Sequence, residues 1–270
     1  QIGNWTPQLG IVLVADRLTA LMLTVSSFVT LAVLVYSSAQ SVSENVERTP
    51  VAIYHPTYLT LVAGVSMAFL AGDLFNLYVG FEMLLLASYV LLTLGATAER
   101  IRAGVTYVVV SLVSSVIFLT AIGVIYAATG TVNMAQLAER LDQLPPDVQM
   151  ILHVLLLIGF GIKAAIFPLS FWLPDSYPTA PAPVTAVFAG LLTKVGIYAI
   201  IRTETLLFSD SSLRVPLLVA AGLTMIVGIL GGSSPGFHNW TDGEAPFVGG
   251  GAGILAIFMV AGFSFQGTEL

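Results

Sequence analysis

Two lysines and one glutamate lie inside strongly apolar segments, where ionisable side chains are costly. Lys163 and Lys194 are the only lysines of the chain, and Glu82 lies within FNLYVGFEMLLLASYV. A lysine at the centre of a membrane span costs roughly 2.5–3.5 kcal/mol on insertion scales. A buried lysine releases its proton far more readily than an arginine does. These residues therefore predict a proton relay in which Glu82 pairs with Lys163, and Lys163 passes its proton to Lys194.

Plain structural roles remain open for the same residues. The lysines would then pair with carboxylates only to fix helix packing, and Glu82 would reach water near its span end. His153 precedes Lys163 by ten residues, about 15 Å along a helix, so it is either a further proton carrier or a lone core histidine. Asp73 lies closer to a helix end, where a structural role is the better interpretation.

The arginines are placed differently from the lysines. Each lies in a predicted loop or within about two turns of a span end, where its head group reaches water. The neighbours Asp16 and Arg17 are expected to form a surface pair. Membrane orientation stays undecided, because Arg48, Arg100 and Arg102 fall on one side and Arg140, Arg202 and Arg214 on the other.

Prolines gather between the two lysines, in PLSFWLPDSYPTAPAP at 168–183. Pro168 removes a backbone hydrogen bond shortly after Lys163 and is expected to break or kink that helix. Interrupted helices that carry an ionisable residue are typical of transport sites near the membrane midplane. Pro174 and Pro178 are assigned to the same gating segment. A rigid turn is the alternative, which explains 174–183 better than it explains Pro168.

Such residues need a scaffold of membrane helices, and the composition supplies one. Of 270 residues, 57% are hydrophobic and 9% are charged, and the mean hydropathy is +0.94. A soluble domain carries about 25% charged residues, so the composition excludes a soluble enzyme, a nucleic-acid-binding protein and a disordered tail. The chain has no cysteine, and no His/Asp/Glu cluster has metal spacing. We expect neither a metal nor a cofactor.

Gaps in charge predict an all-α, polytopic membrane protein with about eight transmembrane helices. The reversal within 57–96 is placed near Asp73, Asn76 and Gly80, and 131–143 is expected to be a short amphipathic helix at the interface. A β-barrel is disfavoured because the apolar runs do not alternate. The spans are expected at 11–36, 57–75, 78–96, 103–128, 149–172, 182–201, 214–231 and 247–266.

Two segments carry a family resemblance. GIKAAIFPLSFWLPDSYPTAPAPVTAVFAGLLTKVGIYAIIRTETLL resembles the antiporter-like subunits shared by Mrp-type multisubunit Na⁺/H⁺ antiporters and proton-pumping NADH:quinone oxidoreductases. AGDLFNLYVGFEMLLLASYVLLTLGA resembles the glutamate-bearing helix of that family. The likeness covers about residues 10–230 and is strongest to the D-type Mrp subunit. It implies that Glu82 is the pairing glutamate, Lys163 the lysine of the broken helix and Lys194 the next relay lysine.

The resemblance also implies a domain organisation. The family fold is two inverted five-helix repeats, of which 57–203 would supply one, with a Pro-broken helix. Residues 1–56 would form an N-terminal segment with one transmembrane helix, and 204–231 one further helix. The segment 232–270, also with one helix, departs from the pattern. Its part SSPGFHNWTDGEAPFVGGGAGILAIFMVAGFSFQGTEL resembles a bacterial amino-acid permease of the lysine/aromatic type, so a mosaic chain is expected, joined near Gly231.

By this resemblance the chain is a non-enzymatic, proton-translocating subunit of a multisubunit Na⁺/H⁺ antiporter in a prokaryotic plasma membrane. Its expected partners are other membrane subunits, the bilayer and the transported H⁺ and Na⁺, without nucleic acid. Three alternatives remain. A proton-pumping subunit of NADH:quinone oxidoreductase would co-purify with flavin and iron–sulfur subunits. A permease fragment rests on 233–270 alone. A structural subunit would tolerate neutral replacements of Glu82 and both lysines.

Overall fold

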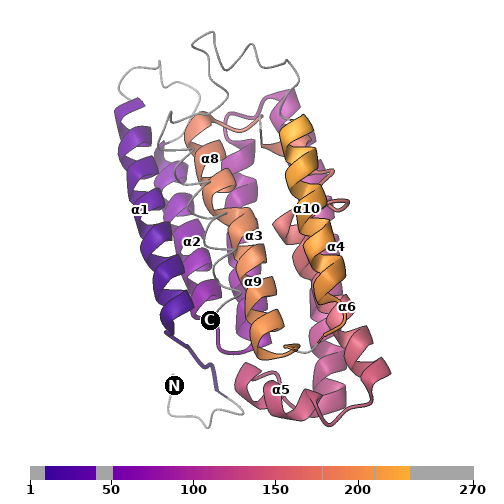
Figure 1. Ribbon diagram of the computed structural model, residues 1–270. Helices are drawn as coiled ribbons and strands as arrows, with labels where there is room; N and C mark the ends of the chain where they lie inside the picture. The colour runs from indigo at the N-terminus through magenta and orange to yellow at the C-terminus, as the bar shows by residue number, and fades with distance from the viewer. Residues whose placement is uncertain (1–9, 41–50, 178, 210, 232–270) are drawn as a thin grey trace.

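The computed structural model describes residues 10–40, 51–177, 179–209 and 211–231. Over these residues the chain is a bundle of long helices lying side by side, with the short helix α5 at one end (Figure 1). The helices are α1 (Arg17–Gln40), α2 (Val51–Leu70), α3 (Leu74–Thr93), α4 (Ala98–Thr129), α5 (Met134–Leu141), α6 (Pro146–Ala164), α7 (Leu173–Ser176), α8 (Ala182–Val187), α9 (Thr193–Leu206) and α10 (Arg214–Gly231), with a π-helical turn, Phe188–Leu192, between α8 and α9.

The prediction of an all-α, polytopic membrane protein is confirmed. In the described part of the chain, six helices are long and apolar enough to cross a membrane. They correspond to the first six expected spans, the sixth being α8, the π-helical turn and α9 read as one helix. The seventh expected span, 214–231, coincides with α10, whose part Arg214–Val227 is a shorter apolar helix. The eighth, at 247–266, lies outside the described residues.

The predicted start of the first span was wrong by six residues. The helix α1 begins at Arg17 and not at residue 11, because the preceding residues run extended along the end of α2. Leu13 forms an isolated antiparallel bridge with Ala71, and the Val14 N–H donates to the Leu70 carbonyl at 2.8 Å. Backbone pairing with the end of α2 thus keeps residues 11–16 out of the helix, although this stretch is apolar.

The reversal between α2 and α3 also lies earlier than predicted. Asp73 is the N-cap of α3, and its Oδ1 accepts a hydrogen bond of 2.6 Å from the Asn76 N–H. A capping carboxylate fixes a helix start at this position. Gly80, which was expected to mark the turn, lies inside α3 instead. A Cβ there would come within 2.9 Å of the Ala68 nitrogen on α2, so glycine is what allows the two helices to touch.

The structure also has a helix end close to residue 128, where the fourth span was expected to end, and a short helix within 131–143. α4 ends at Thr129, and its C-cap Gly130 adopts φ +71°, a left-handed conformation that glycine adopts without strain. Within the segment predicted to lie at the interface, α5 buries Met134, Leu137 and Leu141. These residues are spaced at i, i+3 and i+7 and therefore share one face of the short helix.

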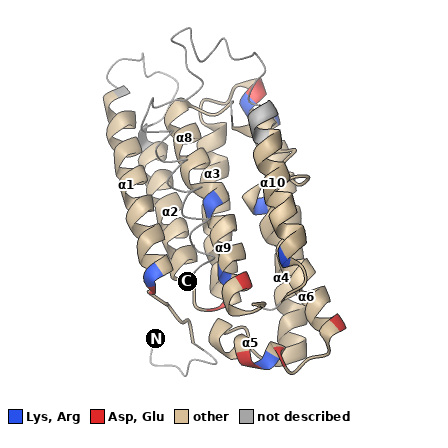
Figure 2. Cartoon of the chain, in the orientation of Figure 1, with Lys and Arg blue, Asp and Glu red and all other residues tan. Residues whose placement is uncertain are grey.

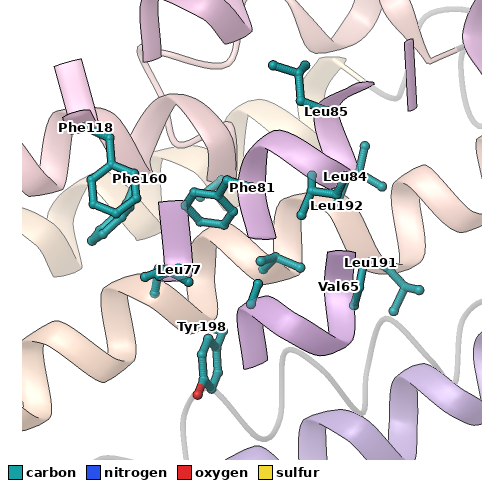
Figure 3. Packing of buried hydrophobic residues seen from close by; sticks show 14 of the residues in the cluster. Val65, Leu77, Phe81, Leu84, Leu85, Phe118, Phe160, Leu191, Leu192 and Tyr198 are labelled. Carbon is teal, nitrogen blue, oxygen red and sulfur yellow. The ribbon is translucent and has the colours of Figure 1, made fainter. Parts of the chain in front are cut away.

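Close aromatic packing joins three of the spanning helices. Phe118 of α4 packs edge-on against Phe160 of α6 at 4.7 Å between ring centroids, and against Phe81 of α3 at 5.8 Å. Figure 3 shows the three rings among the buried core residues. Lipid is as apolar as these rings, so van der Waals contact and close fit hold such helices together.

Charged residues are sparse along the bundle. Figure 2 shows most charged segments near the ends of the helices, with few midway. This distribution agrees with the chain's low charged fraction of 9% and makes each ionisable group within a span a candidate for function.

Candidate functional site

Lys163 lies in the last turn of α6, next to a break in the helix. The helix ends at Ala164, and the following Ala165 adopts φ +54°. The N–H groups of Ala165 and Ile166 donate back to the carbonyls of Ile162 and Gly161, at 3.2 and 3.0 Å. This reversed pairing is a common way to end a helix before a proline. The helix therefore stops short of Pro168, and the expected span to residue 172 was too long.

The backbone groups freed by this break have partners inside the protein. The indole N–H of Trp172 donates to the Ile162 carbonyl at 3.1 Å. The Phe167 N–H donates to the Thr224 hydroxyl of α10 at 2.9 Å. A broken helix is tolerated at membrane depth only where its backbone is satisfied in this way. The break is therefore a built feature of the bundle, held by α10 as well as by its own loop.

The ammonium group of Lys163 faces α3. Its Nζ lies 5.9 Å from the centroid of the Phe81 ring. The neighbouring residue, Glu82, is the carboxylate whose charge acts on Lys163. Glu82 itself accepts a hydrogen bond of 2.5 Å from the Ser115 hydroxyl of α4.

Glu82 and Lys163 lie near each other without forming a direct ion pair. In the part of the chain that the structure describes, the ion pairs within 4 Å are His153–Glu204 and Asp16–Arg202. The serine that holds Glu82 thus occupies the place that the sequence assigned to Lys163.

Lys194 is held by the unusual backbone before it. The π-helical turn Phe188–Leu192 widens the helix just ahead of Lys194, and π-turns occur often at functional sites. The Nζ of Lys194 donates to the Ala189 carbonyl in this turn at 2.5 Å and to the Thr193 hydroxyl at 3.3 Å. The amine therefore rests on two neutral acceptors of its own helix.

The two lysine helices meet through a glycine. A Cβ at Gly196 of α9 would lie 2.6 Å from the Ala164 nitrogen and 2.9 Å from the Lys163 carbonyl carbon. Only a residue without a side chain allows this approach. Lys163 and Lys194 are thus carried by backbone segments in direct contact, each within two residues of the crossing point.

The remaining candidates lie apart from this centre. Asp73 caps α3. Burial raises the pKa of its carboxyl group, although hydrogen bonds from neighbouring backbone N–H groups act in the opposite direction. His153 lies near the start of α6 and pairs with Glu204 of α9. Pro174 is the second residue of the short helix α7, and Pro178 lies outside the described residues. Among those residues, no group of three or more His, Asp or Glu side chains could hold a metal ion.

The expected pair of Asp16 with Arg17 was wrong. Asp16 pairs with Arg202 of α9, whose side chain is largely buried and also donates to the Tyr198 hydroxyl at 2.8 Å. The hydrogen bond from Arg202 holds the pKa of Asp16 well below its usual range. Arg202 therefore ties α9 to the start of α1 and does not reach out to water.

Several contacts of the candidate residues were missed by sequence reasoning. Ser115 lies 33 positions from Glu82, and a serine within an apolar span gives no sign of which carboxylate it meets. Glu204 lies just beyond the predicted span at 182–201, and the sequence assigns it no role. The π-turn beneath Lys194 has no sequence signal, and Trp172 cannot be told from the other apolar residues of its segment.

The chain matches known proteins over most of its length. The family model described as NADH:quinone oxidoreductase/Mrp antiporter, TM, matches residues 71–234. The D-type subunit of the Na(+)/H(+) antiporter of Alkalihalophilus pseudofirmus is 44% identical over 237 residues, covering 87% of this chain and 47% of that protein. A chain of the Mrp complex from Dietzia sp. superposes with a TM-score of 0.75 at 36% identity, covering 86% of this chain and 43% of that one.

A further relative bears on the tail of the chain. The D-type subunit of the probable K(+)/H(+) antiporter of Rhizobium meliloti is 43% identical over 262 residues, covering 95% of this chain and 44% of that protein. That alignment enters the segment 233–270, which was expected to be foreign. The comparisons give the permease resemblance and the mosaic no support, and the segment lies outside the described residues. The chain spans about half the length of the curated relatives it matches.

Proposed function

Because the chain belongs to the family of NADH:quinone oxidoreductase and Mrp antiporter membrane subunits, we propose that it is a proton-translocating subunit of a multisubunit cation/proton antiporter. The names of its relatives, antiporter subunits for Na⁺ or K⁺, support a transport role without an enzymatic reaction of its own. Its proposed setting is a bacterial plasma membrane, where other antiporter subunits are its partners. The five-helix repeat proposed at 57–203 holds Glu82 and both lysines.

The proposed mechanism uses three groups in turn. Protonated Lys163 keeps its proton while Glu82 leans towards it, because an opposite charge favours the ammonium form. When Glu82 returns to the Ser115 hydroxyl, Lys163 loses that support and releases the proton. Lys194 receives it once its own amine is neutral and has left the Ala189 carbonyl. The observation that carries this proposal is the glycine contact at Gly196, which sets the two lysine-bearing backbones against each other.

The test replaces Lys163 in the complete native subunit within its complex. In inverted membrane vesicles, the collapse of a pH gradient on adding NaCl or KCl reports antiport. Lys163→Ala should abolish the signal while the complex still assembles. Lys163→Arg keeps the charge but cannot release the proton, so it should fail too. Arg102→Gln removes an exposed cation and serves as the control. Full antiport in Lys163→Ala would disprove the proposal.

The family description leaves a second candidate, a proton-pumping membrane subunit of an NADH:quinone oxidoreductase. The antiporter names of the relatives favour the first candidate over this one. Purification of the native complex in mild detergent separates the two. Stoichiometric flavin and iron–sulfur subunits would support the oxidoreductase, whereas a complex without either supports the antiporter.

A further inference from the structure

The two lysine helices are joined at a second place by a buried histidine and glutamate. Nε2 of His153 on α6 contacts Oε1 of Glu204 on α9, and Nδ1 lies 2.9 Å from the Ser211 hydroxyl. The Phe208 ring stacks on the imidazole, with centroids 4.1 Å apart and planes within 7°. The histidine side chain is 2% exposed and that of the glutamate 16%. Within the pair, the histidine is therefore shielded from solvent and the glutamate is partly exposed to it.

The position of this pair relative to the lysines is regular. His153 precedes Lys163 by ten residues on α6, and Glu204 follows Lys194 by ten residues on α9. Ten residues of helix span about 15 Å. Since α6 and α9 meet again at Gly196, the pair and the two lysines form two levels of one helix–helix contact. The pair occupies the level near the start of α6 and the end of α9.

Few other charges bear on the pair. On α9, Arg202 is engaged with Asp16. The neighbouring α4 carries its charged residues only in its first two turns, at the opposite end from α5. Among the described residues, the other charged groups near this end of the bundle are Arg17 at the start of α1, Asp73 ahead of α3, Glu139 and Arg140 of α5, Asp142 after it, Asp147 in the first turn of α6 and Arg214, which is exposed at the start of α10.

Buried ionisable groups are a costly way to join two helices. Separating charges from water costs several kcal/mol per ion, and neutral residues of similar size often serve as well. Here both ring nitrogens have polar partners, so the imidazole can take a proton at one nitrogen and give one up at the other. A further polar contact lies along α6 between His153 and Lys163, where the Ser114 hydroxyl donates to the Gly159 carbonyl at 2.8 Å.

We propose that Glu204 and His153 form a proton-collecting dyad between the water at this face and the two lysines. The inference rests on the proposed transport function. Glu204 takes a proton from water and shares it with Nε2 of His153, giving a carboxylate–imidazolium pair. Loss of that proton from the imidazolium, inward to Lys163, restores the neutral imidazole. One proton enters and one leaves in each cycle.

The test measures antiport against pH in vesicles that hold the complete native complex. His153→Gln and Glu204→Gln keep hydrogen-bonding groups of similar size but do not titrate. We expect a loss of about tenfold or more at alkaline pH, where protons are scarce, in keeping with the effects of removing a proton-transfer group. At neutral pH the loss should be about threefold or less, since water supplies protons directly. His55→Gln is the matched control. His55 lies on α2, about 21 Å along the helix from Phe69 near the end of that helix.

A positioning role and a proton-transfer role are separated by rescue. In His153→Ala, imidazole derivatives of different pKa are added; a proton-transfer role predicts that the restored rate follows the pKa of the added base. Restoration that is independent of pKa would overturn the dyad, and so would an unchanged pH profile in both Gln variants. If His153→Gln fails to assemble, Glu204→Gln, altered at the partly exposed residue, decides. Lys163→Ala is measured alongside. If antiport survives in Lys163→Ala, the transport proposal itself is rejected. If antiport is lost in Lys163→Ala while both Gln variants transport as the wild type does, only the dyad is rejected.

Discussion

Gly196 and Lys163 are in backbone contact, although they belong to different membrane-spanning helices. A Cβ at residue 196 would lie 2.9 Å from the carbonyl carbon of Lys163. The lysine lies at the end of its helix, where the backbone turns away at Ala165. The crossing therefore holds one proposed relay residue in place and leaves Lys194 two residues from the contact. The geometry of the relay depends on a residue that has no side chain.

Gly196→Ala should force α6 and α9 apart. The nearest atoms are backbone and cannot rotate away, so overpacking should cost about 1–3 kcal/mol. We expect the Tm of the purified protein, followed by tryptophan fluorescence, to fall by about 3–10 °C. Gly222→Ala is the matched control, because nothing lies within 4 Å of the Cβ position there. Equal Tm values for the two variants would contradict the crossing.

Ser115→Ala should change transport through Glu82. Without the hydroxyl, the carboxylate loses its 2.5 Å hydrogen bond and is expected to remain near Lys163, which then holds its proton more tightly. Antiport should fall about three- to tenfold, with the remaining activity shifted to higher pH. Thr120→Val is the control on the same helix, since its exposed hydroxyl donates to the Val116 carbonyl of α4 itself. A Ser115→Ala profile that matches this control would show that Ser115 does not act on Glu82.

Much of the scaffold could be predicted because it follows from length and solubility. A stretch of about 20 residues without charge has one stable form in a bilayer, so most spans appear in the sequence as gaps in charge. Lys163 and Glu82 stood out for the same reason. The expected span end at 128 lies close to the observed end of α4 at Thr129, where a glycine follows the apolar run, a frequent helix terminus. These are local properties of the chain.

The pairing of side chains was not predictable, because it depends on which helices become neighbours. Arg202 pairs with Asp16 across 186 positions, and its placement near a span end suggested water as its partner. The start of α1 was misplaced because Leu13 pairs with Ala71, a contact without any local signal. No local pattern distinguishes an arginine that reaches water from one that closes a contact between distant helices.

Asp16→Asn should make stability less dependent on acidic pH. In the folded protein the Arg202 hydrogen bond lowers the pKa of Asp16 below its ordinary 3.8, so the carboxylate's contribution is present above about pH 4 and is lost as pH falls further. The side chain is 39% exposed, so after solvent screening the loss should be about 1–2 kcal/mol. Thermal unfolding from pH 3 to 7 measures it. The wild-type Tm should fall on acidification more than that of Asp16→Asn, with exposed Asp142→Asn behaving as wild type.

Thr224→Val should weaken the support that α10 gives to the broken helix. The valine has the shape of threonine but cannot accept the hydrogen bond from the Phe167 N–H, now 2.9 Å long. Leaving that donor without its partner costs about 1–3 kcal/mol, and the segment after Lys163 should become mobile. Hydrogen exchange at residues 165–172 should therefore accelerate roughly five- to a hundredfold if opening is local. Thr224→Ser keeps the hydroxyl and should exchange as the wild type does. Slow exchange in both variants would mean that α10 does not hold the break, and that Trp172 with the loop itself suffices.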